Sequence, residues 1–380
     1  MDHIEQQREG WRKKAREVAK NVVAPRAAEI DAKGEFPWDI VDTFAEQGFL
    51  SLVIPKEFGG MNGDITSFCM VAEEIASYCA SSALLVIVQA VGTMPIVLGG
   101  TQELKEVYLT KIVKDKALVC FCLTEPESGS DAGSIRTKAV LKGDHYLLNG
   151  RKVFVTNGGV ADLSVIFAVT RPDKRVEGIS GFVVEKGTPG LSVGKTEEKM
   201  GIRGSNTTEV ILDDVKVPIT QRIGVEGGAW WLMMRTLNRS RPAIGAQAVG
   251  LAQGAMDYVI RFLKERNGTK KEYVLGVQLK LADMAIEIEA ARALVYKAAA
   301  MMDEKVKGTP VQMFSAMSKY FASDVAMQVT TEAVQILQWE GLVRTHPVER
   351  MMRDAKVIQI FEGTNQIQRM VVAHTLLKGK

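Results

Sequence analysis

The part of the chain after Gly228 contains three long segments whose apolar residues are not confined to one helical face. They cover about residues 229–266, 277–306 and 311–338. A helix that is hydrophobic around most of its circumference must be covered by neighbours on several sides. The pattern therefore predicts a helical bundle in which these segments bury one another.

The middle of the chain, from about Val119 to Pro218, has a different pattern. Short segments rich in Val, Ile, Phe and Thr are separated by Gly, Asp, Asn and Pro, which predicts a small antiparallel barrel or sandwich. The residues before it again favour helices, and the apolar stretch 65–100 is expected to be buried. We therefore predict an α+β fold, mainly α, with an N-terminal helical domain (1–117), a middle antiparallel β-barrel domain (118–225) and a C-terminal four-helix-bundle domain (226–380).

Charge and cysteine usage exclude several classes of function. The net charge is only +3 over 380 residues, so nothing indicates nucleic-acid binding. Four cysteines without C-x-x-C spacing argue against a metal site and suit a reducing compartment, either the bacterial cytoplasm or the mitochondrial matrix. We expect no membrane span, because no apolar run approaches about 18 uninterrupted residues. The charged N-terminus resembles neither a signal peptide nor a transit peptide.

A loop of small hydroxyl residues and glycines follows the first predicted strand, in "CLTEPESGSDAGS". Thr124 and Ser130 are hydrogen-bond donors, and Gly129 lets the backbone approach a ligand closely. Composition alone favours a simple turn held by side-chain hydrogen bonds. Elsewhere, Lys195-Thr196 ends an incomplete phosphate-loop pattern that lacks the first glycine and the following helix, so a nucleotide-triphosphate site is not supported.

The stretch "VIQIFEGTNQIQRMVV" places one carboxylate, Glu362, between two apolar runs. Gly363 permits a sharp bend, and Asn365 and Gln368 can cap the helix that follows. Apolar surroundings raise the pKa of a carboxyl group and so make a better general base, although Glu362 could also merely decorate a helix end. The residues expected along the packed face of the following helix are Ile367, Met370, Val371 and Leu377.

These motifs resemble those of the acyl-CoA dehydrogenase family. The loop matches the family signature at Thr124, Glu125, Gly129, Ser130 and Asp131. Further matches occur in the family's order over nearly the whole chain, in "GEFPWDIVDTFAEQGFLSLVIPKEFGG", "GRKVFVTNG", "KMGIRGSNTTEVILDDVKVP" and "VERMMRDAKVIQIFEGTNQIQRMVVAHTLL". The resemblance implies a helix–barrel–helix fold and FAD-dependent α,β-dehydrogenation of an acyl-CoA thioester. In that reaction a carboxylate takes the α-proton while the β-hydrogen leaves as hydride to the flavin N5.

The resemblance also implies roles for individual residues, with Glu362 as the catalytic base. Some family members carry the base at the position of Arg241, where a guanidinium cannot serve because it stays protonated. The positions implied to contact FAD are Phe121, Leu123, Thr124, Gly129, Ser130, Phe154, Val155, Thr156, Arg266, Gln335, Thr364 and Gln366. Those implied to contact the acyl-CoA are Ser130, Asn238, Arg241 and Gly363. Asn238 stands where relatives usually have Asp, which is expected to alter CoA binding.

Two segments depart from the family pattern. After Arg266, relatives have Phe-Gly where this chain has Thr269-Lys270, and Gln338-Trp339 replace a glycine pair that follows Gln335. In the family both segments come from the neighbouring subunit and hold the adenine end of FAD, where bulky side chains do not simply replace glycines.

Several alternatives therefore remain open at the level of the sequence. The chain forms a homotetramer with an altered adenine site, or it is one subunit of a heteromeric dehydrogenase with an incomplete shared FAD site, or it is a CoA-binding scaffold without flavin. An acyl-CoA oxidase or an enoyl-CoA reductase of the same fold is also compatible. The length favours a dehydrogenase that passes electrons to electron-transfer flavoprotein. The acyl group is not predicted, although residues 84–94 are expected to form part of its wall.

Overall fold

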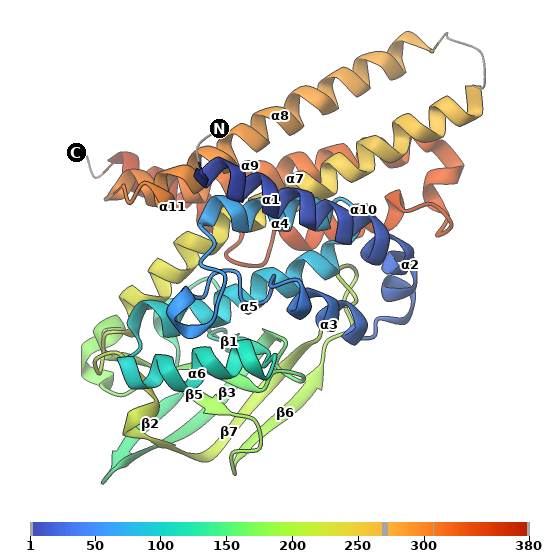
Figure 1. Ribbon diagram of the computed structural model, residues 1–380. Coiled ribbons are helices and arrows are strands. Elements are labelled where there is room, and N and C mark those ends of the chain that lie inside the picture. Colours follow the sequence, from blue (N-terminus) through green and yellow to red (C-terminus); the bar gives the residue numbers. More distant parts are fainter. Residues whose placement is uncertain (1–2, 268–272, 307, 378–380) are drawn as a thin grey trace.

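Figure 1 shows a computed structural model of the protein, which describes residues 3–267, 273–306 and 308–377. The N-terminal part of the protein is helical. Its helices are α1 (His3–Val18), α2 (Ala24–Lys33), α3 (Trp38–Glu46), α4 (Ile65–Ala76), α5 (Ala80–Gly99) and α6 (Gln102–Lys114). A π-helical turn, Ala19–Val23, joins α1 to α2. Helix α4 begins at a cap in which Asp64 accepts a hydrogen bond from the Ser67 amide, which satisfies one of the free donors at its N-terminus.

The middle part is an eight-stranded sheet with the order β6-β7-β3-β2-β4-β5-β8, and β1 pairs with β4. Its strands are β1 (Val119–Cys122), β2 (Lys138–Lys142), β3 (His145–Thr156), β4 (Leu163–Val169), β5 (Ile179–Glu185), β6 (Leu191–Thr196), β7 (Thr207–Pro218) and β8 (Arg222–Ile223). Most pairs are antiparallel as predicted, but β4 is parallel to both β1 and β2. The parallel β1–β4 pair is possible because the β2–β3 hairpin supplies the long connection between them.

The C-terminal part comprises α7 (Ala229–Asn267), α8 (Leu275–Asp303), α9 (Thr309–Leu337), α10 (Val348–Ile358) and α11 (Asn365–Leu377). Helices α7, α8 and α9 pack against one another, and the N-terminal helix α4 also packs against α7 and α8. The predicted bundle is therefore not built from C-terminal residues alone. Its close α4–α7 contact depends on Gly250 and Gly254, where a Cβ would lie 2.1 Å from Glu73 O and 1.9 Å from Ser77 O.

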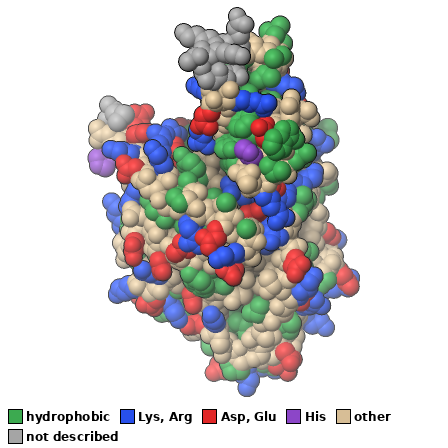
Figure 2. All heavy atoms as spheres, turned by 90° about the vertical axis from the view of Figure 1, so that its right-hand side faces the viewer, with side chains coloured by type: hydrophobic (Ala, Val, Ile, Leu, Met, Phe, Trp, Pro, Cys, Tyr) green, Lys and Arg blue, Asp and Glu red, His purple; other side chains and the backbone are tan. Residues whose placement is uncertain are grey.

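The barrel lies below the bundle in Figure 1, and the two ends of the bundle differ. Helix α11 lies at one end, and the C-terminal end of α7 lies with the N-terminal end of α8 at the other. Figure 2 views the molecule from the side of this α7–α8 end and shows apolar side chains gathered in its upper part. Large exposed apolar residues near that end are Val274, Leu275, Trp339 and Leu342.

Helix α5 is long and apolar enough to cross a membrane by length and composition, but 83% of its most apolar window is buried inside the fold. Every residue from Leu84 to Met94 is buried. Its two polar side chains in this stretch are satisfied internally: Gln89 bonds Ala117 O and the Val119 amide, and Thr93 donates to Gln89 O. We therefore interpret α5 as a core helix that supports β1.

Candidate active site

The connection between α10 and α11 forms a tight bend at Glu362 and Gly363. Both residues have left-handed backbones, with φ of 55° at Glu362 and 89° at Gly363. For a residue with a side chain, this conformation costs about 1–2 kcal/mol. A Cβ on Gly363 would lie 2.6 Å from the Gln368 Nε2, so glycine is required here by contact as well as by conformation. The bend thus holds one carboxylate in a conformation that other interactions must stabilise.

Glu362 is half-buried, and among the described residues its carboxylate has one direct side-chain partner. Ser240, on α7, donates to Glu362 Oε2 over 3.2 Å and also lies 3.1 Å from Leu237 O. Burial raises the pKa of Glu362 above its ordinary value, although Arg241, the hydrogen bond from Ser240 and Lys319 act in the opposite direction. A desolvated carboxylate with a raised pKa has the proton affinity that a general base requires.

Arg241 is buried on α7 and accompanies this carboxylate. Its Nη1 donates to Asn238 Oδ1 over 2.8 Å, while its Nε has no partner among the hydrogen bonds of the described residues. Burial lowers the pKa of Arg241 to about 10, and the charge of Glu362 acts in the opposite direction. Because Asn238 contributes no charge, Glu362 is the carboxylate that the Arg241 guanidinium senses most directly.

The bend is held by Lys319, which sequence reasoning did not identify, and by Gln368, which was expected only as a helix cap. Lys319 on α9 donates to Gly363 O, and Gln368 on α11 donates to the same carbonyl, at 2.9 and 3.0 Å. Lys319 also donates to Asn365 Oδ1 over 2.9 Å. The sequence offered a weak signal for Lys319, because it is the one basic residue between Thr309 and Leu337.

Two expectations about α11 were wrong. Thr364, rather than Asn365 or Gln368, caps the helix by accepting from the Ile367 amide over 3.3 Å. The apolar face was expected to be packed, but Met370 and Leu377 are 64% and 87% exposed, whereas the polar Asn365 and Gln368 are buried. The buried face of α11 is polar because Gln368 donates to the Gly363 carbonyl, while Asn365 accepts from Lys319 and donates to Asp324 on α9.

A second group of predicted residues meets at the ends of β1 and β3. The Val153 amide donates to Thr124 O over 2.9 Å, which places the loop after β1 beside the end of β3. Phe154 has a left-handed backbone, with φ of 53°, and its ring is 64% exposed. The side chains of Leu123 and Val155 are buried instead, so only their backbones can face a ligand.

A buried ion pair fixes this second group in place. Lys152 on β3 donates to Glu125 Oε1 over 2.7 Å and to Leu123 O over 3.1 Å. Glu125 also accepts from the amide and hydroxyl of Thr137, at 3.0 and 2.6 Å, and from the Arg136 amide. Burial alone would raise the pKa of Glu125, but Lys152 and these hydrogen bonds hold it below its ordinary value. The pair thereby fastens the loop after β1 to β3.

Arg266 and Gln335 do not join either group within one chain. Arg266 belongs to the last turn of α7 and Gln335 to the last turn of α9, and these helix ends lie away from the barrel strands in Figure 1. Arg266 Nη1 pairs with Glu340 Oε2 over 3.0 Å. The adjacent Gln338 has φ of 58° and ψ of −131°, a conformation that favours glycine. The backbone therefore keeps a glycine-like turn despite the larger side chain. The departure at Thr269-Lys270 lies outside the described residues.

The remaining predicted contact positions differ in exposure. Phe121 and Thr156 are half-buried, whereas Gly129, Ser130 and Gln366 are exposed. None of the hydroxyls of Thr124, Ser130 and Thr156 has a hydrogen-bond partner within the described ranges 3–267, 273–306 and 308–377. Free hydroxyls beside an exposed aromatic ring suit a flat ligand with polar edges.

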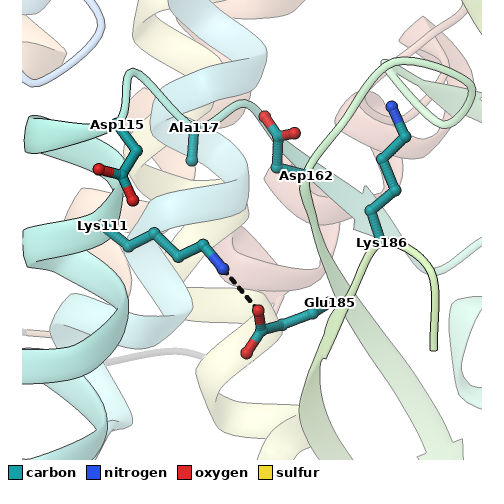
Figure 3. A pocket seen from close by; sticks show the side chains of 6 residues that line it. All are labelled: Lys111, Asp115, Ala117, Asp162, Glu185 and Lys186. Carbon is teal, nitrogen blue, oxygen red and sulfur yellow. Dashed lines mark hydrogen bonds and ion pairs between the residues drawn. The ribbon is translucent and has the colours of Figure 1, made fainter.

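Figure 3 shows a hollow of about 290 Å³ between α6 and the sheet, apart from all of these groups. Lys111 Nζ pairs with Glu185 Oε2 over 2.5 Å across it. Asp162 Oδ2 accepts from the Leu118 amide over 2.9 Å. Because Lys111, Glu185 and Asp162 are engaged in holding α6 and the strands together, this hollow is not a candidate active site.

Comparison with known proteins decides the family. Three family models match the chain: the N-terminal domain of acyl-CoA dehydrogenase over residues 5–116, the middle domain over 120–215 and the C-terminal domain over 227–377. The chain belongs to the acyl-CoA dehydrogenase family. The exposed Phe154 ring and the free hydroxyls beside it fit the flavin that this family binds.

Individual relatives agree over the full length of the chain. Cyclohex-1-ene-1-carbonyl-CoA dehydrogenase of Syntrophus aciditrophicus is 44% identical over 99% of this chain and 91% of its own. The structure of butyryl-CoA dehydrogenase from Megasphaera elsdenii superposes with a TM-score of 0.92 at 38% identity, covering 99% of both chains. A chain solved in work on the electron transferring flavoprotein of Acidaminococcus fermentans gives a TM-score of 0.94 at 39% identity, covering 100% of this chain and 99% of the other.

Proposed function

We propose that this chain desaturates an acyl-CoA thioester between its α- and β-carbons and that Glu362 removes the α-proton. The observation that carries the assignment is the bend: a half-buried carboxylate with a raised pKa, held by Ser240 beside the buried Arg241. Bound FAD supplies the acceptor for the β-hydrogen, which leaves as hydride. The residues that would hold the flavin are Phe121, Thr124, Ser130, Phe154 and Thr156.

The α-proton of a thioester is weakly acidic, so its base must be oriented and partly dry before substrate arrives. The left-handed bend gives Glu362 one direction, and burial increases its proton affinity. Arg241 cannot compete as a base but places a positive charge beside the reacting carboxylate. These properties support Glu362 as the catalytic base and exclude Arg241 from that role.

The acyl group is proposed to be apolar throughout. Residues 84–94 carry no ionisable side chain, and their two polar groups, Gln89 and Thr93, are already hydrogen-bonded inside the fold. A wall of this kind offers nothing to pair with a second carboxylate at the end of a dicarboxylic acyl chain. Branched, cyclic and short linear acyl groups remain compatible.

The proposed assembly is a homotetramer whose electrons pass to electron-transfer flavoprotein. Arg266 and Gln335 are exposed and far from the barrel of their own chain, so a second chain would have to bring them to an FAD. Apolar residues along one exposed face of α8 support such packing; they are Leu275, Leu279 and Ile286. A heterotetramer with a related chain is the alternative. The free, buried cysteines support a reducing compartment, the bacterial cytoplasm or the mitochondrial matrix.

Substrate-dependent bleaching of the oxidised flavin band tests the proposal. Glu362→Gln should bind FAD normally but bleach at least about 10²-fold more slowly, because the variant lacks its general base. Glu332→Gln, an ion-paired glutamate on α9, is the matched control and should behave as wild type. Native bleaching by Glu362→Gln would contradict the assignment, and a chain that stays colourless after FAD is added would contradict the flavin site.

A panel of acyl-CoA thioesters in the same assay tests the substrate class. Butyryl-CoA and cyclohex-1-ene-1-carbonyl-CoA should bleach the flavin faster than glutaryl-CoA, whose terminal carboxylate has no partner along residues 84–94. Preference for glutaryl-CoA would contradict an apolar wall. Comparing an artificial electron acceptor under anaerobic conditions with peroxide release in air separates a dehydrogenase from an oxidase.

A further inference from the structure

Lys319 is a completely buried lysine directly beneath the catalytic bend. Its side chain is 0% exposed, and its Nζ donates to Gly363 O and to Asn365 Oδ1, both at 2.9 Å. Both acceptors are uncharged. The ammonium thus reaches the backbone one residue after Glu362 without contacting the carboxylate itself.

Other side chains of α9 secure both flanks of the same bend. Ser323 Oγ lies 3.1 Å from Asn365 Oδ1, and Asp324 Oδ1 accepts from Asn365 Nδ2 over 2.7 Å. Before the bend, Gln359 Nε2 also donates to Asp324 Oδ1 over 2.7 Å. The backbone N–H of Asn365 donates to Gln359 O over 3.0 Å, which joins the two ends of the bend. Helix α9 therefore fixes the entry and the exit of the bend, and Lys319 fixes its middle.

We propose that Lys319 is a positioning residue that holds the Gly363 carbonyl and so aims the Glu362 carboxylate at the substrate. The inference rests on the proposed role of Glu362 as the base. Left-handed backbone at both Glu362 and Gly363 needs an anchor, and the two donors on Gly363 O, from Lys319 and Gln368, provide it. Lys319 is the donor that belongs to a different helix, so it links the bend to the bundle.

A purely structural role would not require a charge at this position. A neutral amide could donate to the same carbonyls, whereas a buried ammonium loses its hydration. The charged groups that face Lys319 are Glu362, Arg241 and Asp324. Arg241 and the protonated form of Lys319 therefore both lower the pKa of Glu362, which favours its ionised, proton-accepting form.

Two substitutions separate orientation from charge in the FAD-loaded enzyme. Lys319→Met removes both the hydrogen bonds and the charge, whereas Lys319→Gln removes the charge and keeps an N–H donor. Gln328→Met, an exposed position on the same helix, is the matched control. The measurements are the rate of flavin bleaching by acyl-CoA, the exchange of the substrate α-hydrogen in D₂O, and the dependence of both on pH. FAD content and thermal unfolding confirm that each variant is folded.

Lys319→Met should slow bleaching and α-hydrogen exchange by roughly 10²-fold, the effect expected when a reacting group is misplaced by about 1 Å. Both Lys319 variants should move the acidic limb of the rate profile to higher pH, because removing a nearby cation raises the pKa of Glu362. Lys319→Gln should be faster than Lys319→Met, because it keeps a donor, but its acidic limb should stay at the higher pH.

Folded Lys319 variants with native exchange rates and an unmoved limb would overturn the inference. So would a loss confined to FAD content or thermal stability, which would assign Lys319 a structural role only. The result for Glu362→Gln is independent: if that variant turns over normally, the proposed base is wrong, whatever Lys319 does.

Discussion

Two lysines, Lys152 in the barrel and Lys319 in the bundle, are 0% exposed within the part of the chain that the structure describes. Lys152 is paired with a carboxylate, Glu125, over 2.7 Å. Lys319 contacts only the neutral oxygens of Gly363 and Asn365. The same side chain thus occurs once inside an ion pair and once beside a carboxylate that it does not touch.

The difference in partners separates a structural charge from a functional one. At Lys152 the opposite charge of Glu125 lies in direct contact, so the pair fastens the loop after β1 to β3. The two charges largely cancel, so the pair exerts little electrostatic field on its surroundings. Burial lowers the pKa of both lysines; at Lys152 the charge of the contacting Glu125 opposes the shift. At Lys319 burial lowers the pKa to about 7, and the largest opposing influence is the charge of Glu362, which Lys319 does not contact. A group with a pKa near neutrality can respond to changes in charge at its neighbour.

The largest effect expected from this comparison concerns Lys152. Lys152→Met leaves the Glu125 carboxylate buried without its cation, which should destabilise the protein by about 3–5 kcal/mol in urea unfolding. Removing both charges in Lys152→Met with Glu125→Gln should cost less than the single change, because no unpaired charge is left. Lys186→Met, at an exposed lysine directly after β5, is the control. Equal stability of Lys152→Met and Lys186→Met would show that the ion pair is not structural.

The sequence predicted the architecture because apolar periodicity determines which segments must be buried. The all-round apolar pattern of α5 and of residues 229–338 predicted core helices, and the pattern of short β-branched segments predicted the sheet. Packing between distant segments was not predictable. The close approach of α4 to α7 depends on Gly250 and Gly254, whose partners are backbone oxygens far away in the sequence.

The sequence identified residues of the candidate site only where they belong to a recognisable motif. Glu362 is recognisable beside its glycine, but Lys319 and Asp324, five residues apart on a helix, resemble an ordinary solvent-exposed charged pair in the sequence. Which face of α9 points inward depends on where α11 docks, and that docking uses buried amides rather than apolar residues. The packed face expected for α11 was wrong for the same reason: Met370 and Leu377 are exposed.

The next largest effect concerns protein stability as a function of pH, which should report the protonation of Lys319. The pKa of Lys319 falls from an ordinary value near 10.5 to about 7 on folding. Between these values the unfolded chain binds more protons, so stability rises with pH, by at most about 1.4 kcal/mol per pH unit. Lys319→Met lacks this group, and the stability difference, wild type minus variant, should grow from pH 7 to pH 9 in urea titrations. A difference that stays constant over that range would show that Lys319 is protonated to the same extent in both states.

The smallest effect concerns Ser240, whose hydroxyl donates directly to Glu362. Ser240→Ala removes a hydrogen bond of 3.2 Å from the ionised carboxylate. Because this bond is long and the same hydroxyl also bonds Leu237 O, we expect it to contribute only about 0.5–1.5 kcal/mol, as an ordinary hydrogen bond does. That corresponds to an upward shift of the acidic limb of the bleaching profile by about 0.4–1 pH unit. The rate on the alkaline plateau should change little, because Lys319 still holds the bend. Ser77→Ala, whose hydroxyl bonds Glu74 O on α4, is the control and should leave the profile unmoved. If Ser240→Ala instead lowers the plateau as much as Lys319→Met, the hydroxyl orients the carboxylate, and the separation between a positioning lysine and a tuning serine is lost.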